Sequence, residues 1–166
     1  MIAIKRITTE TALLFKDIRL RALQDSPWAF GSTHAKEAQL SDEEWVKRAA
    51  RWGGDRTDAI FLAFDGETPC GIVGSYVDEG QPETAHVISM WVDPAYRRAS
   101  VGNALIDGVI AWNRSIGASG LKLMVTSVNQ GAIAFYMRMG FRMTGVTGPY
   151  PNDPAIIEYE MALAIS

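Results

Sequence analysis

A strand-to-helix junction at Val92–Leu105 constrains the fold of this 166-residue chain more than any other segment. An apolar run ends at Val92, and a turn of small residues flanked by Arg97 and Arg98 leads into a segment with apolar residues at helical spacing. The first N–H groups of a helix have no intrahelical partners and lie at the positive end of its dipole. The junction therefore predicts a phosphate-binding turn, to which the two arginines add charge-assisted hydrogen bonds.

This turn differs from the common nucleotide-binding loops. A P-loop requires Gly-Lys-Ser/Thr where this chain has Gly102-Asn103-Ala104, and a dinucleotide fingerprint requires three spaced glycines rather than one. Taken alone, so short a motif also fits an ordinary loop before a capped helix with solvated arginines. Other segments of the chain are needed to distinguish a phosphate-binding turn from an ordinary loop.

Periodicity and turn residues predict the order strand, two helices, three strands, helix, strand, helix, two strands. The predicted strands cover residues 1–7, 59–64, 70–77, 84–92, 121–126, 141–147 and 156–163. The predicted helices cover residues 9–24, 41–52, 100–115 and 129–139. In the first helix we expect Leu14, Ile18 and Ala22 on the buried face. The last strand alternates apolar residues with Glu158 and Glu160, which places both glutamates on its polar face.

The composition is that of a globular protein, with 48% hydrophobic and 21% charged residues. A net charge of −3 with dispersed Lys and Arg argues against nucleic-acid binding. We find neither a signal peptide nor the roughly twenty apolar residues of a membrane span. The single Cys70 and two histidines favour neither a disulfide nor a zinc site, and Cys70 fits a small buried residue. We therefore expect one cytoplasmic domain over residues 1–166, without a metal or a membrane partner.

The segment Arg97–Gly102 resembles the acetyl-CoA loop of the GNAT family of N-acetyltransferases, Arg/Gln-x-x-Gly-x-Gly/Ala, which follows a Val-x-Pro-x-Tyr-Arg lead-in. The match holds at every fixed position except Ser100, where the family usually has its first glycine. A Cβ at this position restricts the backbone if φ is positive. Serine is also a favoured N-cap, and its hydroxyl can donate to phosphate.

The segment Asn129–Phe141 resembles a second motif of the family, Asn-x-x-Ala-x-x-Phe/Tyr-Tyr-x-x-x-Gly-Phe. The resemblance implies that Asn129 binds the pantetheine arm and that the Tyr136 phenol lies near the cofactor sulfur. With pKa values of about 8.5 for a thiol and about 10 for a phenol, proton donation to the leaving thiolate is uphill by only about 2 kcal/mol. Without the phosphate-binding turn, we would expect Asn129 to cap a helix and Tyr136 to pack at its surface.

The resemblance implies an α/β (α+β) fold with a mixed, twisted central sheet of about seven strands flanked by about four helices. In the family, the strands before the turn and after its helix splay apart, here residues 84–92 and 121–126. In the family, backbone amides at a bulge that ends the first strand, here Met90, Trp91 and Val92, face the acetyl carbonyl, and each such donor contributes about 3 kcal/mol. The implied cofactor-binding residues are Met90, Trp91, Val92, Arg97, Arg98, Ala99, Ser100, Val101, Gly102, Asn103, Asn129, Ala132, Phe135 and Tyr136.

Two further groups of residues are candidates for the acceptor side. His86 is the candidate general base, because it lies four residues before Met90, where several family members place a glutamate, and imidazole titrates near pH 6.5. A structural role in the strand is the alternative. Trp28, Phe30 and Arg21 are candidates for substrate binding, because this region overhangs the acceptor pocket in the family; aromatic residues in loops also serve as lids over the core.

The resemblance implies an enzyme that moves an acetyl group from acetyl-CoA to a small-molecule or peptide amine. Neither motif positions a side chain that could carry the acyl group, so we expect direct attack in a ternary complex. Transfer of a longer acyl group and a non-catalytic acyl-CoA sensor or scaffold are the alternatives. Dimers are common in the family, and a homodimer is one arrangement that the sequence leaves open.

Overall fold

The computed structural model describes residues 1–54 and 56–166. Its strands are β1 Ile2–Arg6, β2 Asp58–Asp65, β3 Thr68–Asp78, β4 Gln81–Val92, β5 Gly120–Thr126, β6 Arg142–Tyr150 and β7 Asp153–Ala164. Its α-helices are α1 Ala12–Asp25, α2 His34–Glu37, α3 Asp42–Gly54, α4 Val101–Ser115 and α5 Gln130–Arg138. Three short 3₁₀ helices are η1 Thr9–Thr11, η2 Pro27–Ala29 and η3 Pro94–Tyr96.

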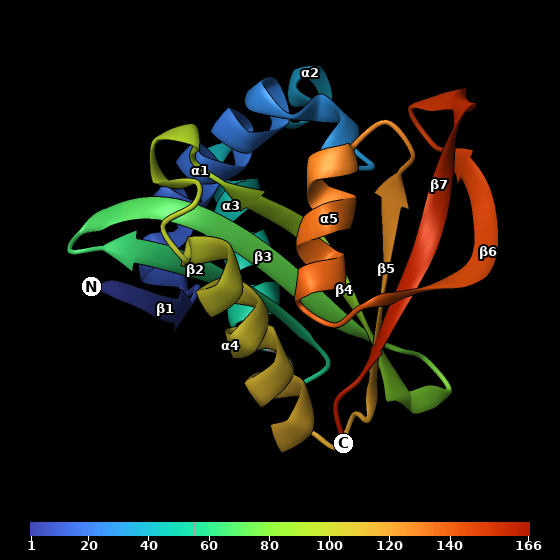
Figure 1. Cartoon of the computed structure of the whole chain (residues 1–166). Coiled ribbons are helices and arrows are strands. Elements are labelled where there is room, and N and C mark those ends of the chain that lie inside the picture. The colour runs from blue at the N-terminus through green and yellow to red at the C-terminus, as the bar shows by residue number, and fades with distance from the viewer. Residues whose placement is uncertain (55) are drawn as a thin grey trace.

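The seven strands form one mixed sheet in the order β1-β2-β3-β4-β5-β7-β6. Neighbouring strands are antiparallel except β4 and β5, which are parallel and pair only from Thr84–Gly120 to His86–Lys122. Beyond these pairs the two strands diverge, as Figure 1 shows. The mixed sheet with helices around it confirms the expected fold class, and the four-residue α2 is the helix that the sequence pattern did not predict.

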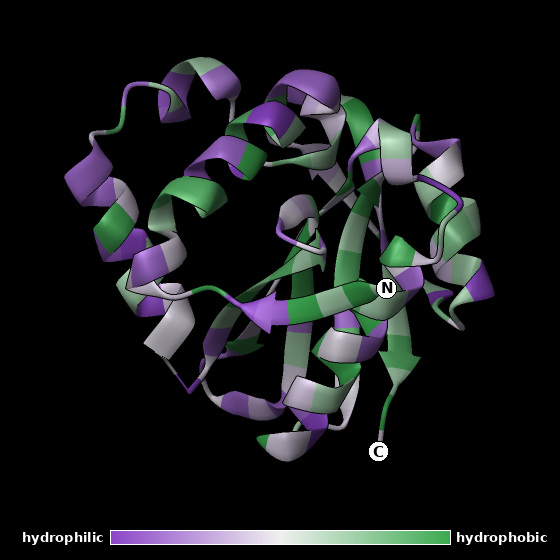
Figure 2. Ribbon diagram, turned by 90° about the vertical axis from the view of Figure 1, so that its left-hand side faces the viewer, coloured by the Kyte–Doolittle hydropathy of each residue, from purple (hydrophilic) through white to green (hydrophobic). Residues whose placement is uncertain are grey.

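The sheet separates two hydrophobic cores. Helices α1 and α3 pack on one face through Ile18 and Trp45, and α4 packs on the other through Leu105. Strand β2 serves both cores, because Phe61 belongs to one and its neighbour Leu62 to the other. Figure 2 accordingly shows hydrophobic residues concentrated along the central strands, whereas the helices alternate between polar and apolar residues.

The local signals for the helices are mostly confirmed. The Ser41 hydroxyl accepts from the Glu44 amide at 3.2 Å and the Glu44 carboxylate accepts from the Ser41 amide at 3.0 Å, so the expected capping box begins α3. On the buried face of α1, Ile18 and Ala22 are confirmed and Leu14 is wrong. Leu14 is 40% exposed and Phe15 is 3% exposed, because Phe15, Ile18 and Ala22 share one side of the helix.

The structure describes the environment of the single cysteine and the lengths of the helices. Cys70 is fully buried in β3, and burial raises the pKa of its thiol, as expected of a small apolar core residue. Among the helices of the described residues, none is long and apolar enough to cross a membrane.

Candidate active site

Two cavities lie along the gap where β4 and β5 diverge. The loop cavity, of about 580 Å³, is bounded by residues 96–103 and α5, and the sheet cavity, of about 430 Å³, by β4, β5 and the chain around η2. The two cavities adjoin each other, because they share the lining residues Trp28, Ala29, Met90, Asn129, Ala132 and Tyr136. The expected gap between the diverging strands is therefore open.

The turn at the start of α4 lines the loop cavity and carries backbone donors without partners in the described chain. The amides of Arg97 and Ala99 pair within the turn, with the carbonyls of Pro94 and Tyr96 at 3.4 and 3.3 Å. Among the described residues, no carbonyl or side chain pairs with the amides of residues 98 and 100–103. These donors belong to a loop and a first helical turn, the arrangement that binds a phosphate group through main chain.

The turn departs from ordinary backbone geometry at two side-chain-bearing residues. Ser100 has φ +65° and Arg98 has φ +67°, in the left-handed region that favours glycine. The restriction expected from a Cβ at Ser100 is thus present. Ser100 occupies the N-cap position of α4, but its hydroxyl makes no capping hydrogen bond and it lines the loop cavity.

Gly102 permits a close approach between α4, α5 and the end of β4. A Cβ at Gly102 would lie 3.1 Å from the ring of Phe135 and 3.4 Å from the methyl group of Met90. The glycine of the second fixed position in the turn is therefore required by packing as well as by access to the cavity. This contact joins the two motifs that the sequence analysis singled out.

Arg97 is tied to the end of α1. Its Nε donates to the Val92 carbonyl at 3.0 Å and its Nη2 to Asp25 Oδ2 at 2.6 Å. Asp25 also accepts from Trp91 Nε1 at 3.0 Å and from the Ser26 hydroxyl at 2.7 Å. Burial alone would raise the pKa of Asp25, but these hydrogen bonds outweigh it and leave the pKa lowered. The cluster anchors the turn to the helix beneath it.

A β-bulge distorts β4 next to the gap. The β3–β4 register runs from Ile72–Trp91 to Gly74–Ile88, so that Ser89 and Met90 together oppose one residue of β3. Ser89 has φ +57°. A bulge leaves backbone groups outside the ladder. The expected bulge is present one residue earlier than predicted, and Ser89 is a member that the sequence analysis missed.

A buried ionic cluster holds the bulge. Arg19 Nη1 donates to the Ser89 hydroxyl at 2.7 Å, while its Nε and Nη2 donate to the Glu37 carboxylate at 3.1 and 3.0 Å. Arg48 adds a third hydrogen bond to Glu37 at 3.0 Å. Burial would raise the pKa of Glu37, which is 2% exposed, but Arg19, then a hydrogen bond from Ser32 and then the charge of Arg48 together outweigh burial and lower it. No sequence pattern signalled this cluster, because its members come from three helices.

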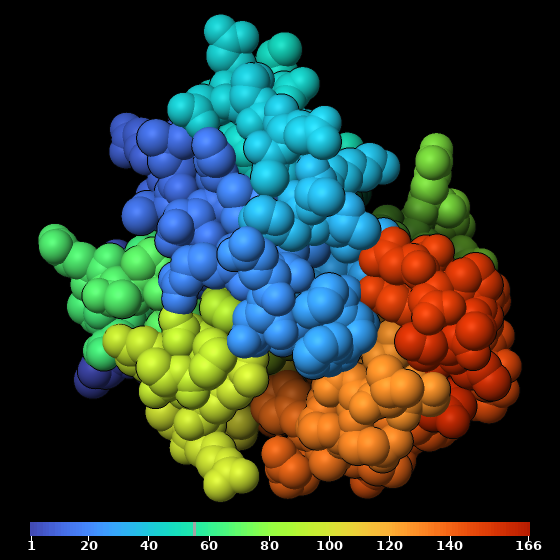
Figure 3. All heavy atoms as spheres, turned by 90° about the horizontal axis from the view of Figure 1, so that it is seen from above, coloured from blue at the N-terminus to red at the C-terminus, as the bar shows by residue number. Residues whose placement is uncertain are grey.

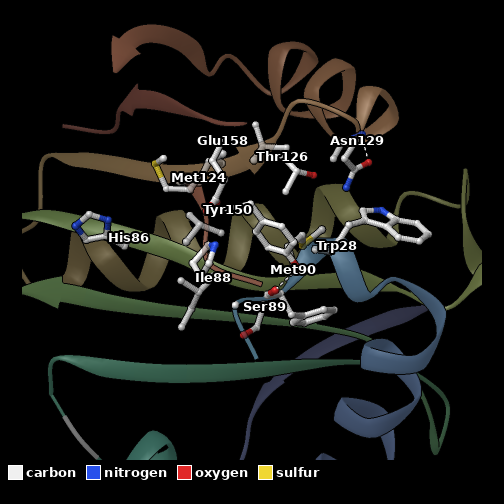
Figure 4. A pocket seen from close by; sticks show the side chains of 18 of the residues that line it. Trp28, His86, Ile88, Ser89, Met90, Met124, Thr126, Asn129, Tyr150 and Glu158 are labelled. Atoms are coloured by element: carbon white, nitrogen blue, oxygen red, sulfur yellow. Dashed lines mark hydrogen bonds between the residues drawn. The ribbon is translucent and has the colours of Figure 1, made fainter. Parts of the chain in front are cut away.

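The second motif contributes Asn129 and Tyr136. Asn129 Oδ1 accepts from the Ala132 amide at 3.2 Å, which caps α5 as the alternative interpretation proposed, and Figure 4 shows its side-chain nitrogen directed toward Trp28. Tyr136 is 7% exposed and lines both cavities. Burial raises the pKa of its phenol well above the ordinary value. Tyr136 thus suits hydrogen-bond donation, and full proton transfer costs more than expected from an ordinary phenol.

Two rows of side chains face each other across the sheet cavity in Figure 4. The first row comes from β4 and comprises His86, Ile88, Ser89 and Met90. The second row comes from β5, β7 and the start of α5 and comprises Met124, Glu158, Thr126 and Asn129. His86 lies at the end away from Asn129, and it precedes Ser89 by three residues, about 10 Å along an extended strand. Its Nε2 is 2.8 Å from Asp78 Oδ1, and its ring stacks on Tyr76 at 4.7 Å.

Glu158 is a site residue that the alternation of β7 did not reveal. It pairs directly with Thr126 across β5 and β7 and lines the sheet cavity. Within the described part of the chain, no hydrogen-bond donor or basic side chain contacts its carboxylate, and burial raises its pKa. The hydroxyl of Thr126 is also buried without a hydrogen-bond partner. The face of β7 that was predicted to be polar therefore forms part of the wall of the sheet cavity.

The chain around η2 covers one end of the sheet cavity and contributes Trp28, which is 43% exposed, and Phe30. The Tyr150 hydroxyl lies 2.7 Å from the carbonyls of Pro27 and Phe30, and Asn152 Nδ2 donates to the Phe30 carbonyl at 3.1 Å. These bonds fasten the β6–β7 turn to the η2 segment. Figure 3 shows the two regions side by side, one blue and one red.

Arg21, the third candidate for the acceptor side, is placed elsewhere. Its guanidinium pairs with Asp93, lies 3.7 Å from Asp17 and stacks over the Trp91 ring at 5.6 Å from the centroid. It is not among the described residues that line either cavity. Similarly, no three His, Cys, Asp or Glu side chains of the described residues gather as metal ligands would.

Comparisons with known proteins agree with this geometry. The model of the acetyltransferase (GNAT) family matches residues 19–141. An uncharacterised N-acetyltransferase of Methanocaldococcus jannaschii is 30% identical over 104 residues, which are 60% of this chain and 46% of that protein. The chain spans about half the length of the curated relatives it matches.

Two solved structures share the fold. The acetyltransferase of the GNAT family from Streptococcus pneumoniae has a TM-score of 0.83 and 21% identity, over 100% of both chains. The paia N-acetyltransferase from Thermoplasma acidophilum, in complex with coenzyme A, has a TM-score of 0.76 and 15% identity, over 99% of both chains. With the family model matching most of the chain, and the turn, gap and bulge all present, this chain belongs to the acetyltransferase (GNAT) family.

Proposed function

We propose that residues 1–166 form a single domain that transfers an acetyl group from acetyl-CoA to a small-molecule or peptide amine, by direct attack within a ternary complex. One observation carries this proposal. Four residues whose amides have no partner in the described chain, 98, 100, 102 and 103, line a cavity that adjoins a second cavity at the β4–β5 gap. A cofactor held at the first cavity can thereby meet an acceptor held in the second. Family membership and the coenzyme A complex of the Thermoplasma acidophilum structure support this.

The residues present fit coenzyme A. The amides of residues 98 and 100–103 and the Arg98 side chain would hold its diphosphate, and Gly102 leaves the room that a Cβ would fill. Asn129 and the wall formed by Ala132 and Phe135 would hold the pantetheine arm. When bound, acetyl-CoA supplies the acetyl group as a thioester that the amine attacks with loss of the thiol.

The chain's own groups then have distinct tasks. Backbone donors of the Ser89–Met90 bulge would stabilise negative charge on the carbonyl oxygen, because preorganised amides need no reorientation during the reaction. The Tyr136 phenol, which stays protonated at neutral pH, would donate a hydrogen bond to the sulfur. His86 stays a prediction as the general base: with Nε2 donating to Asp78, its Nδ1 would be the nitrogen that accepts a proton.

The first experiment combines calorimetry with coenzyme A and measurement of thiol release from acetyl-CoA. The amines are polyamines, amino acids, aminoglycosides and short peptides. Transfer to one class together with coenzyme A binding supports the proposal. Binding without transfer to any amine favours the sensor, and use of longer acyl-CoA in place of acetyl-CoA favours the longer-chain transferase. Absence of coenzyme A binding overturns both the proposal and the sensor.

The Tyr136→Phe variant tests the phenol. We expect kcat to fall by about 100-fold with unchanged affinity for coenzyme A, because a positioned proton or hydrogen-bond donor contributes at about this level. Tyr159→Phe is the matched control, because Tyr159 lies in β7 outside both cavity linings. Equal kcat values for Tyr136→Phe and the wild type would remove Tyr136 from the mechanism.

A further inference from the structure

We propose that Glu158 binds the ammonium group of the acceptor and, in place of the predicted His86, accepts its proton. The proposal rests on the proposed acetyl-transfer function and defines its acceptor class, a primary alkylamine that is protonated at neutral pH. Its observation is a half-buried carboxylate without a partner in the described chain, in the wall of the sheet cavity.

The register of the sheet directs Glu158 into the cavity. Residues directly opposite in an antiparallel pair lie on the same face, so Glu158 shares a face with Thr126. Thr126 and Met124, two residues apart on β5, both line the sheet cavity. Figure 4 shows Glu158 between these two side chains and opposite Ile88, between His86 at one end and Asn129 at the other.

The other acidic groups around the cavity already have partners. Asp78 contacts His86, and Glu37 is paired with Arg19 and Arg48. Arg19, which lines the cavity, therefore brings a charge that Glu37 already neutralises. A half-buried carboxylate left without a partner is costly unless a cation joins it. Glu158 thus gives the cavity a local negative charge that an ammonium group would complement.

No titratable group of the described chain around Glu158 neutralises the negative charge of its carboxylate. From the packed elements these groups are Arg19 of α1, Tyr76 of β3, His86 of β4, Lys122 of β5, Tyr136 of α5, Tyr150 of β6 and Glu160 of β7. Arg19 is paired with Glu37, and His86 contacts Asp78. Glu160 Oε1 accepts from the Thr144 hydroxyl at 2.9 Å. Lys122 pairs with His86 across β4–β5 and is not among the described lining residues.

The remaining walls suit the body of an organic cation. Trp28, Phe30, Tyr76 and Tyr150 line the cavity, and aromatic faces attract ammonium groups and pack well against the carbon chain that bears them. A volume of about 430 Å³ suits a small molecule or the end of a peptide. A primary alkylamine whose carbon chain bears an aromatic or alkyl group combines these requirements.

The proton transfer balances without a further reactant. The ammonium group R–NH₃⁺ gives one proton to the Glu158 carboxylate, which becomes a neutral carboxylic acid and leaves R–NH₂ with its lone pair free. Glu158 later releases the proton to water. Burial raises the pKa of Glu158 toward the range in which a carboxylate is an effective base near neutral pH.

The test compares an alkylamine with an aromatic amine in Glu158→Gln. Tyramine is protonated at pH 7, whereas p-anisidine is neutral and needs no proton acceptor before attack. We expect Glu158→Gln to lower kcat/KM for tyramine by about 100-fold and for p-anisidine by less than about threefold. Glu160→Gln on the same strand is the matched control and should leave both rates unchanged. An equal loss for both amines, or no loss for tyramine, overturns the proposal.

A second measurement does not depend on turnover. Calorimetry follows tyramine binding to the protein saturated with coenzyme A. We expect Glu158→Gln to bind tyramine at least about tenfold more weakly than the wild type, with Glu160→Gln unchanged. Equal binding by Glu158→Gln and wild type, or no tyramine binding by the wild type, overturns the acceptor class. Failure of the proposed function is distinguishable, because it appears in the wild type as absence of coenzyme A binding or as coenzyme A binding without transfer to any amine.

Discussion

Single residues in unusual states mark the site. Ser89, Arg98 and Ser100 have positive φ without being glycine, and all three lie beside the cavities. Strained backbone of this kind persists only where surrounding contacts impose it. Glu158 is unusual in another way, because it is half buried with its charge uncompensated by the described chain. At these four residues, backbone strain or an uncompensated charge lowers the stability of the fold beside the proposed site.

Replacing Ser100 by glycine relieves its left-handed conformation. We expect Ser100→Gly to raise the free energy of unfolding by about 0.5–1 kcal/mol, because the left-handed penalty of a Cβ exceeds the added entropy of a glycine in the unfolded chain. Urea denaturation measures this change. Ala99→Gly in the same turn, where φ is not positive, is the control and should lower stability. A loss of stability in Ser100→Gly would contradict the strain assigned to this position.

The stability of the wild type should also depend on Glu158. Its pKa is higher in the folded than in the unfolded chain, so its contribution to stability is present below the unfolded pKa and is lost as pH rises through the folded pKa. Glu158→Gln removes the titrating carboxyl group, so the variant does not lose this stability as pH rises. We therefore expect the Tm difference between variant and wild type to grow in favour of the variant from pH 4 to pH 8. A constant difference over this range would show that the carboxylate is not desolvated.

At the level of elements, three helices cooperate to hold one bulge. Arg19 of α1 reaches Ser89 of β4 and is itself fixed by Glu37 of α2, which Arg48 of α3 also contacts. The capping box of α3 and the glycine-ended α5 were predictable, because their signals are local. Helix α2 was not, because four residues show no periodicity. The cluster was not predictable either, since nothing local indicates which helix ends meet.

Removing Glu37 tests this cluster. Glu37→Ala leaves Arg19, whose side chain is 13% exposed, without its buried counter-charge, and we expect a loss of about 3–5 kcal/mol in the free energy of unfolding. Urea denaturation at pH 7 measures the loss, with Glu67→Ala in the exposed β2–β3 turn as control. Because the pKa of Glu37 is lowered on folding, the wild-type advantage should shrink as pH falls through that lowered value. A loss below about 1 kcal/mol would show that the pair contributes little.

At the scale of the whole molecule, the site exists because β4 and β5 pair over only three residues before separating. The loop cavity and the sheet cavity meet at this gap, and the turn between β6 and β7 closes one side by bonding to the η2 segment. Ligand binding at the gap therefore connects both halves of the sheet. Coenzyme A should accordingly stabilise the whole fold rather than one loop.

Thermal unfolding with and without coenzyme A tests this coupling. At a hundredfold excess over Kd, binding adds about 2.7 kcal/mol to stability, which corresponds to a Tm increase of about 5–10 °C for a chain of this length. Pantetheine, which lacks the diphosphate, is the matched control and should raise Tm much less at the same concentration. Equal shifts for both ligands would contradict the role assigned to the amides of residues 98 and 100–103.

The amino-acid sequence alone determined the order of the elements, the turn before α4 and the motif that begins at Asn129, because helix termini and hydrophobic periodicity are properties of neighbouring residues. Only the tertiary structure decided that Ser89 belongs to the bulge, that Arg21 pairs with Asp93, and that Glu158 lines the sheet cavity. The physical reason is strand register. The alternation of β7 shows which residues share a face, but only the pairing of β7 with β5 beside an open gap turns that face into the wall of a site.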